Sequence, residues 1–165
     1  MSVVESFPVV SRIADELFNR LNKLTAGFSP FTAVYEVVRL QRLGQYTPRH
    51  LQIVLTKGAI EEVPELSCPG NPPAIAWRQV FDIRCHVLPS EKDPTPIDTY
   101  CEVMAADVVR AVCDPTRWHT FGGLSINAEW LATEDINSDG GMDGVNVPIA
   151  ITYRTDEDNP FNVRA

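Results

Sequence analysis

No stretch of this 165-residue chain approaches the ~20 consecutive apolar residues that a membrane-spanning helix requires. The first residues, Met1 to Glu5, lack the basic start and apolar run of a secretory signal peptide, so we expect none. Internal repeats and low-complexity tracts are also missing. With 44% hydrophobic and 22% charged residues, the composition is that of a folded protein, and the length predicts a single domain over residues 1–165.

Cysteine pairs with the spacing of metal ligands are absent. The four cysteines, Cys68, Cys85, Cys101 and Cys113, include no C-x-x-C pair, which argues against a zinc ribbon. Cys85 falls on the apolar face of a strand pattern and Cys101 at an apolar position of a helix pattern. We therefore expect buried, free thiols and a reducing cytosolic origin.

Basic residues are too few to balance the acidic ones. The chain has 14 Lys and Arg against 22 Asp and Glu, which gives a net charge of -8 and a pI near 4.8. A protein that holds phosphate backbones needs clustered Lys and Arg, so this charge disfavours a nucleic-acid binder. It remains compatible with a conduit that DNA passes without binding.

Sequence motifs of common enzyme classes are missing as well. The chain contains no G-x-S-x-G, H-E-x-x-H, G-x-x-x-x-G-K or G-x-G-x-x-G. Its histidines, His50, His86 and His119, lie in three different segments. His86 is on the polar face of its strand pattern, which predicts a surface histidine pointing away from Cys85. We predict no catalytic residues and no cofactor. The acidic runs at 61–62 and 156–158 are interpreted as solvated loop charge.

Hydrophobic periodicity predicts the first half of the fold. A helix is expected over 7–25 because apolar residues recur every three or four positions and form one stripe: Val9, Ile13, Leu17, Leu21 and Leu24. Arg20 is expected on the opposite, polar side. Strands are expected over 31–42 and 50–57, joined by a hairpin loop from Gly44 to Pro48. A loop rich in proline and glycine follows at 63–74.

The second half adds the clearest strand, over 75–88, then a helix over 95–114 and two strands over 124–130 and 145–153. Pro148 has no N–H, which places the last strand at an edge or marks a bulge there. The helix buries Met104, Val108 and Val112 against the sheet. The order predicts an α+β domain: a mostly antiparallel sheet of about five strands with two helices on one face.

One acidic segment matches half of a calcium-binding loop. Asp135, Asn137 and Asp139 are followed by Gly140, and Asp143 takes the ninth position, but position twelve is Asn146 where a bidentate Glu is expected. The flanking periodicity also indicates strands where an EF-hand has helices. We interpret 135–144 as a long, polar hairpin tip and predict no metal site beyond a weak cation-binding loop.

The C-terminal part carries a family resemblance. A strand with Trp130 leads through the acidic segment into V-P-I-A-I-T-Y-R-T at 147–155, and D-N-P-F follows at 158–161. With a helix first and another after the third strand, this pattern resembles the tail terminator and tail-completion (head-tail joining) proteins of tailed bacteriophages. The residue-level likeness is confined to roughly 124–161, and these families share no catalytic motif.

The resemblance implies a structural role in the virion. Tail terminators assemble in the host bacterial cytoplasm as a ring, usually hexameric, on the last ring of the tail tube. They end its polymerisation and face the head-side connector in the neck region, while DNA passes through the lumen. The implied partners are further copies of this chain, the tail tube protein and the connector, with no membrane. No residue-level binding site carries over.

Three alternatives stay open from sequence. The chain could be a neck or head-completion adaptor of similar small fold, or a binding module that uses the loop at 135–143. It could also be an enzyme whose site is assembled from distant residues, which would require His86 or His119 to meet acidic side chains in a pocket.

Overall fold

A long central strand organises the fold of the protein, which is a computed structural model that describes residues 7–26, 34–40, 46–89 and 92–164. Parts of the predicted strand over 31–42 and of the predicted loop over 44–48 lie outside these residues. In chain order the elements are α1 (Val9–Leu21), η2 (Asn22–Ala26), β1 (Glu36–Arg39), β2 (Gln52–Glu62), η3 (Pro64–Leu66), β3 (Ala74–His86), α2 (Ile97–Cys113), η4 (Trp118–Gly123), β4 (Asn127–Trp130), β5 (Glu134–Ser138), β6 (Gly141–Asn146) and β7 (Ile149–Asp156).

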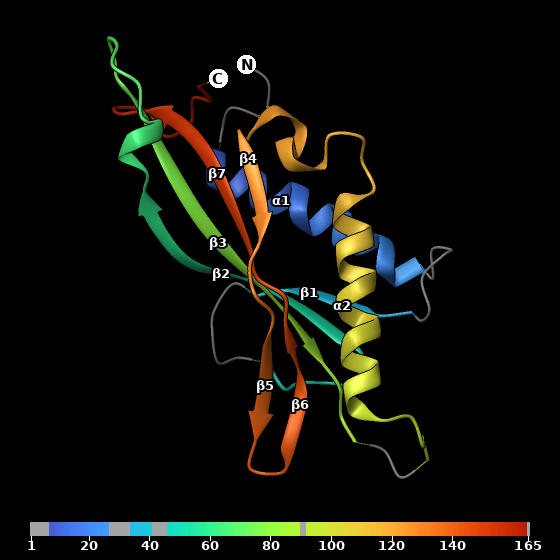
Figure 1. Ribbon diagram of the computed structural model, residues 1–165. Helices are drawn as coiled ribbons and strands as arrows, with labels where there is room; N and C mark the ends of the chain where they lie inside the picture. Colours follow the sequence, from blue (N-terminus) through green and yellow to red (C-terminus); the bar gives the residue numbers. More distant parts are fainter. Residues whose placement is uncertain (1–6, 27–33, 41–45, 90–91, 165) are drawn as a thin grey trace.

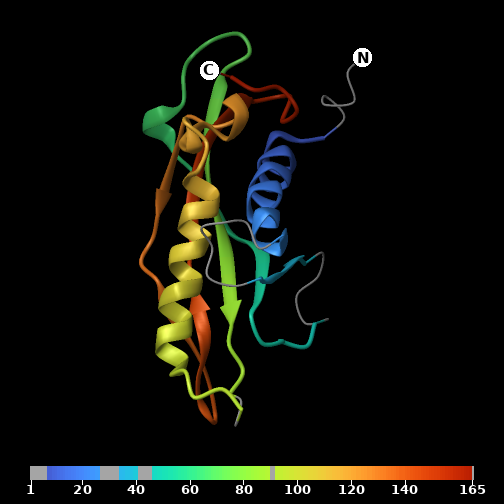
Figure 2. The ribbon, with the colours of Figure 1, turned by 90° about the vertical axis from the view of Figure 1, so that its right-hand side faces the viewer.

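The architecture is α+β, as the sequence predicts, with a mostly antiparallel sheet (Figure 1). β3 lies at its centre. It pairs with β2 on one side and with β6 and β7 on the other, and β5 and β4 lie outside β6 and β7. α2 runs lengthwise along the strands, as Figure 2 shows most clearly. Among the described residues, no helix combines the length and the apolar character needed to cross a membrane.

The sheet has seven strands, where the sequence predicted about five, because the last predicted hairpin is interrupted in both of its arms. β6 and β7 keep one register against β3, from His86 opposite Gly144 to Ala74 opposite Asp156. Between them, the Val147 N–H donates to the Ile83 carbonyl at 2.9 Å. β6 and β7 are therefore one long strand that is broken only at Val147 and Pro148.

The position of Pro148 differs from both expectations, the edge and the bulge. β7 is internal, between β3 and β4, and the ladder with β3 runs through without a shift. Because the Val147 N–H points to β3, the nitrogen of Pro148 faces the outer strand. That outer strand is itself interrupted there, between β4 and β5, and only the Leu131 N–H reaches the Pro148 carbonyl. The gap removes the need for the hydrogen bond that proline cannot donate.

The predicted hairpin between the first two strands is wrong, because β1 and β2 are parallel, with Glu36 opposite Gln52 and Arg39 opposite Leu55. A tight loop cannot join parallel neighbours, because the chain has to travel back from the end of the first strand to the start of the second. The described part of this connection places Tyr46 against His86, on the face away from the helices. The alternation of apolar residues is the same whether two strands pair in parallel or antiparallel, so the sequence pattern could not distinguish these two arrangements.

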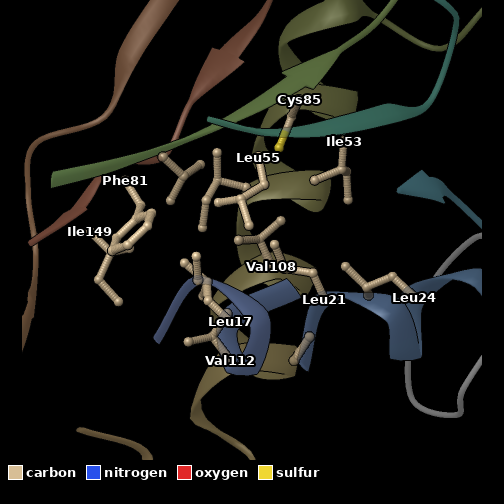
Figure 3. Packing of buried hydrophobic residues seen from close by; sticks show 14 of the residues in the cluster. Leu17, Leu21, Leu24, Ile53, Leu55, Phe81, Cys85, Val108, Val112 and Ile149 are labelled. Atoms are coloured by element: carbon tan, nitrogen blue, oxygen red, sulfur yellow. The ribbon is translucent and has the colours of Figure 1, made fainter. Parts of the chain in front are cut away.

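Both helices cover the same face of the sheet and share one hydrophobic core (Figure 3). The predicted stripe of the first helix is confirmed, since Val9, Ile13, Leu17 and Leu21 are fully buried. On α2, Met104, Val108 and Val112 are fully buried against the same cluster. The sheet contributes the matching layer, of which Ile53, Leu55, Phe81, Ile83, Cys85, Ile149 and Ile151 are the central members.

Candidate assembly surface

The most distinctive surface feature is a two-stranded arm formed by β5 and β6, which lies at the lower end of the sheet in Figure 1. Its acidic residues are Glu134, Asp135, Asp139 and Asp143, and the sequence from Leu131 to Val147 contains no Lys, Arg or His. The arm therefore carries a charge of -4, half of the chain's net charge of -8. We call this hairpin, residues 134–146, the acidic arm.

The acidic arm is built as a strand pair almost to its end, so the predicted long tip at 135–144 is wrong. The ladder continues to Ser138 opposite Gly141 and leaves only Asp139 and Gly140 in the turn. The Gly140 N–H donates to the Ser138 hydroxyl at 3.3 Å, and Gly141 has φ of 112°, a conformation that favours glycine. An Asp-Gly pair between two strands is a strong hairpin signal, and it could have located this turn from sequence.

The candidate cation-binding residues lie along this ladder. Asp135 is opposite Val145 and Asn137 is opposite Met142, while Asp139 is in the turn and Asp143 is on the returning strand. A calcium loop has to curl so that its first, third and fifth residues converge on one ion, whereas β5 is extended. In the part of the chain that the structure describes, no group of three or more His, Cys, Asp or Glu side chains could hold a metal ion.

The base of the acidic arm is fixed by close backbone contact. Gly144 lies opposite His86, and a Cβ atom at Gly144 would be only 2.1 Å from the carbonyl oxygen of Cys85. Next to this pair the Val87 N–H donates to the Asp143 carbonyl at 2.8 Å. Only glycine allows this approach, so Gly144 permits β6 to lie against β3 at the base of the arm.

His86 is buried, against the prediction of a surface histidine; only 4% of it is exposed. It does lie on the face away from the helices, but the returning segment after β1 covers it, and its Nε2 is 3.0 Å from the Tyr46 hydroxyl. Burial, followed by the nearby Arg84, lowers the pKa of His86. The strand pattern gave the correct face, and the covering segment could not be foreseen from it.

The other two histidines lie in different surroundings. The Nδ1 of His50 accepts the Leu88 N–H at 3.2 Å, and its ring packs edge-on against Tyr100. His119 packs edge-on against Trp118 in η4. His50 also lines a pocket together with Asp93. His86 and His119, the two histidines that the enzyme alternative requires, lie in separate places and have different aromatic neighbours.

All four cysteines are free thiols. Cys85 and Cys101 are buried as expected, whereas Cys68 is exposed in the loop before β3. Burial raises the pKa of Cys85 above its usual range and that of Cys101 to about 11. Because the thiolate is the reactive form, these two thiols are inert packing residues.

Two buried polar residues were missed by sequence reasoning. Arg20, expected on the polar side of its helix, is 4% exposed and donates from Nη1 to the carbonyls of Val112 (3.3 Å) and Trp118 (2.5 Å). Its guanidinium also lies 4.2 Å from the centre of the Phe121 ring. Position 20 is three residues after Leu17, which puts it at the border of the buried stripe and is the signal that could have revealed it.

The second buried polar residue is Asp107 on α2. Its Oδ2 accepts a hydrogen bond from the Tyr35 hydroxyl at 2.6 Å, and both residues are almost completely inaccessible. Burial, and then the hydrogen bond to this carboxyl, raise the pKa of Tyr35. The pair ties the chain entering β1 to α2, and Arg20 ties α1 to the end of α2, so both have structural roles.

Within the part of the chain that the structure describes, both margins of the sheet present backbone that is open to pairing. On one margin the parallel neighbour β1 ends opposite Leu55, while β2 continues to Glu62. On the other margin β4 and β5 are the outermost strands. Open edges are sites where a further strand can be added from another molecule.

No family model matches the chain, and a search of curated proteins finds none that is significantly similar.

Proposed function

We propose that this protein is a structural component of a tailed bacteriophage that forms a ring on the end of the tail tube, ends tube polymerisation and joins the tube to the head-side connector. The proposal rests on the resemblance at 124–161. The observation that supports it best is the acidic arm, whose exposed strand β5 forms one margin of the sheet.

The geometry suits assembly between copies. A ring requires surfaces that one subunit presents to the next. The acidic arm presents β5, most of which is exposed, at the outer margin of the sheet, whereas β6 packs against α2 and the core. Contact between the acidic arm of one copy and a different surface of the next would be head-to-tail, the kind of contact that can close into a ring.

The charge suits a DNA conduit. In a hexamer the net charge would be about -48, of which the six acidic arms would supply about -24, and such a field repels phosphates from a lumen that it lines. DNA would then pass without being held.

The experiment is a deletion of the gene in a phage that encodes this chain, followed by complementation. The three complementing genes encode the parent, a variant shortened from Asn137 to Met142, and a full-length Gly140→Ala variant as the control. Shortening removes the end of the arm, including Met142, which packs against the core. It leaves only Asp143 between Ile136 and Gly144, which are paired in the parent. The pairing of Gly144 with His86 on β3 is retained, so we expect the variant to fold with a reduced melting temperature, and a thermal melt has to show that it is folded before complementation is scored.

We expect the deletion to give tails of abnormal length, the shortened variant to fail to restore normal particles, and Gly140→Ala to restore them. Tails of normal length that do not join heads would instead indicate the neck or head-completion adaptor. Normal, infectious particles in the complete absence of the protein would refute both roles.

A further inference from the structure

We infer that the open edge of β2 and an apolar groove beside it form a docking site for an extended segment of a partner protein, one that carries apolar side chains next to Lys or Arg. The site lies beside the first turn of α1 and the end of β7, away from the acidic arm (Figure 1). It does not depend on the proposed assembly role.

The first observation is the unpaired backbone of β2. All residues from Lys57 to Glu62 are exposed, and no described strand pairs with their outer side. The Val63 N–H donates inward to the Ala76 carbonyl at 2.9 Å, so strand alternation directs the backbone groups of Ile60 and Glu62 outward. These groups form the template that an added strand requires.

The second observation is a groove of about 260 Å³ on the helix side of the same edge. Its lining comes from four elements and the C-terminal segment, and includes Val10, Ile60, Ile75, Trp77, Tyr153 and Pro160. Trp77 and Tyr153 are directly opposite each other in the ladder of β3 and β7, and Ile60 is 51% exposed. The volume is below the roughly 300–1,000 Å³ of pockets that enclose a drug-sized ligand, so the groove suits side chains of an extended chain.

Charge defines the chemistry of the occupant. Glu62 lies opposite Trp77 and therefore on the groove side of β2, and Glu157 lines the groove itself; both are exposed. The neighbouring Asp156, expected to be solvated, is 7% exposed and is held by Arg164 at 3.3 Å and Asn162 at 2.9 Å. The two exposed carboxylates beside an apolar groove favour a segment with Lys or Arg next to its apolar residues.

The same charges argue against a second copy as the occupant. The opposite margin of the sheet, which would have to pair with β2 in a continuous sheet between copies, carries Glu129, Glu134 and Asp135. Arg78 forms ion pairs with both Glu61 and Glu129, so the repulsion would come from the other carboxylates. Placing Glu134 and Asp135 against Glu62 would bring like charges together across the new strand pair, which is destabilising.

The test uses the full chain and a fluorescein-labelled peptide of nine residues that alternates Val with Lys and has a central Trp. One control peptide replaces each Lys with Glu, and a second is N-methylated at alternate amides so that it cannot add as a strand. Fluorescence anisotropy gives the dissociation constant for the parent and for three variants: Ile60→Lys, the double variant Glu62→Lys with Glu157→Lys, and Leu88→Lys. Leu88 is an exposed apolar residue that does not line the groove, so the last variant is the matched control.

We expect the basic peptide to bind the parent and Leu88→Lys equally, within twofold, and to bind Ile60→Lys at least tenfold more weakly. The double variant should also bind at least tenfold more weakly at low salt, with a smaller difference in 0.5 M salt. Neither control peptide should bind comparably. All variants change exposed side chains, and equal thermal melts establish that they are folded.

Three results would overturn the inference: no binding of the basic peptide, equal binding of the acidic peptide, or unchanged binding by Ile60→Lys. A fourth is a change of sedimentation mass of the protein alone on Ile60→Lys, which would mean that a second copy covers this edge. Because the measurement needs neither phage nor ring, its failure and that of the proposed tail role are separate outcomes.

Discussion

Replacing Gly144 by alanine should destabilise the protein strongly, although the change adds a single methyl group. The added Cβ would be 2.1 Å from the Cys85 carbonyl oxygen, 3.1 Å from the carbonyl carbon and 3.2 Å from the His86 Cα. All three neighbours are backbone atoms of β3, so no side chain can rotate away. Relief requires that β6 and β3 separate locally by about 1 Å, since Cβ contacts below about 3 Å are essentially not tolerated.

The magnitude follows from what this separation disrupts. Three residue pairs join β3 to β6, and the Val87 N–H bond to Asp143 adjoins them. Loss of two or three hydrogen bonds costs about 1 kcal/mol each, and local overpacking adds about 1–3 kcal/mol. The gain of about 0.4–1 kcal/mol from replacing glycine in the unfolded chain is smaller. We expect a net loss of about 3 kcal/mol.

The assay is thermal and denaturant unfolding of Gly144→Ala beside Gly140→Ala. For a chain of this size, a loss of about 3 kcal/mol lowers Tm by roughly 6–12 °C. The matched control changes the same residue type in the same hairpin, but its new Cβ would meet only the Ser138 hydroxyl at 3.9 Å, so its Tm should change little. Equal melting of the two variants would show that β6 does not approach β3 as closely as described.

Four further predictions follow from the core, the buried polar residues and the acidic arm. Val108→Asp buries an unpaired charge at a fully buried position and should cost about 4 kcal/mol or more in unfolding free energy; unchanged melting would contradict the core assignment. Arg20→Met leaves two carbonyls without their donor and should cost about 2–4 kcal/mol by denaturant unfolding, whereas a cost near zero would argue against its buried bonds. Burial lowers the pKa of His86 in the folded state, so the unfolded state binds more protons and the free energy of unfolding should fall as the pH drops through about 6.5. His86→Gln should reduce this dependence on pH between about pH 7 and 5. An unchanged dependence would count against the burial of His86. Calcium binding through Asp135–Asp143 should be weak by calorimetry, and a tight stoichiometric site would favour the binding-module alternative.

Much of the fold could be predicted from sequence, because an element that is buried on one face has apolar residues at regular intervals. The stripe from Val9 to Leu21 predicted α1, and the alternation over 75–88 predicted β3 and its two faces. These patterns depend only on local geometry, 3.6 residues per turn or two per pleat, so they survive without knowledge of neighbours. The α+β class followed from the order of the elements.

The candidate surface was only partly accessible in the same way. The acidic composition of 134–143 was plain from sequence, as was a hairpin between two strands. Its rigid two-stranded form depends on the close approach of Gly144 to Cys85, a contact between residues almost 60 positions apart. The groove beside Ile60 likewise combines α1, β2, β3 and β7, so no local pattern could indicate it.

The sequence by itself thus determined which apolar residues of α1, α2 and β3 face the core, the class of the fold and the sign of its charge, because each of these depends on composition and local periodicity. Only the tertiary structure decided the direction of β1 relative to β2, the burial of His86 and Arg20, and the internal place of Pro148. The physical reason is that pairing direction and burial depend on which distant backbone and side-chain groups satisfy one another, and a one-dimensional pattern does not contain that information.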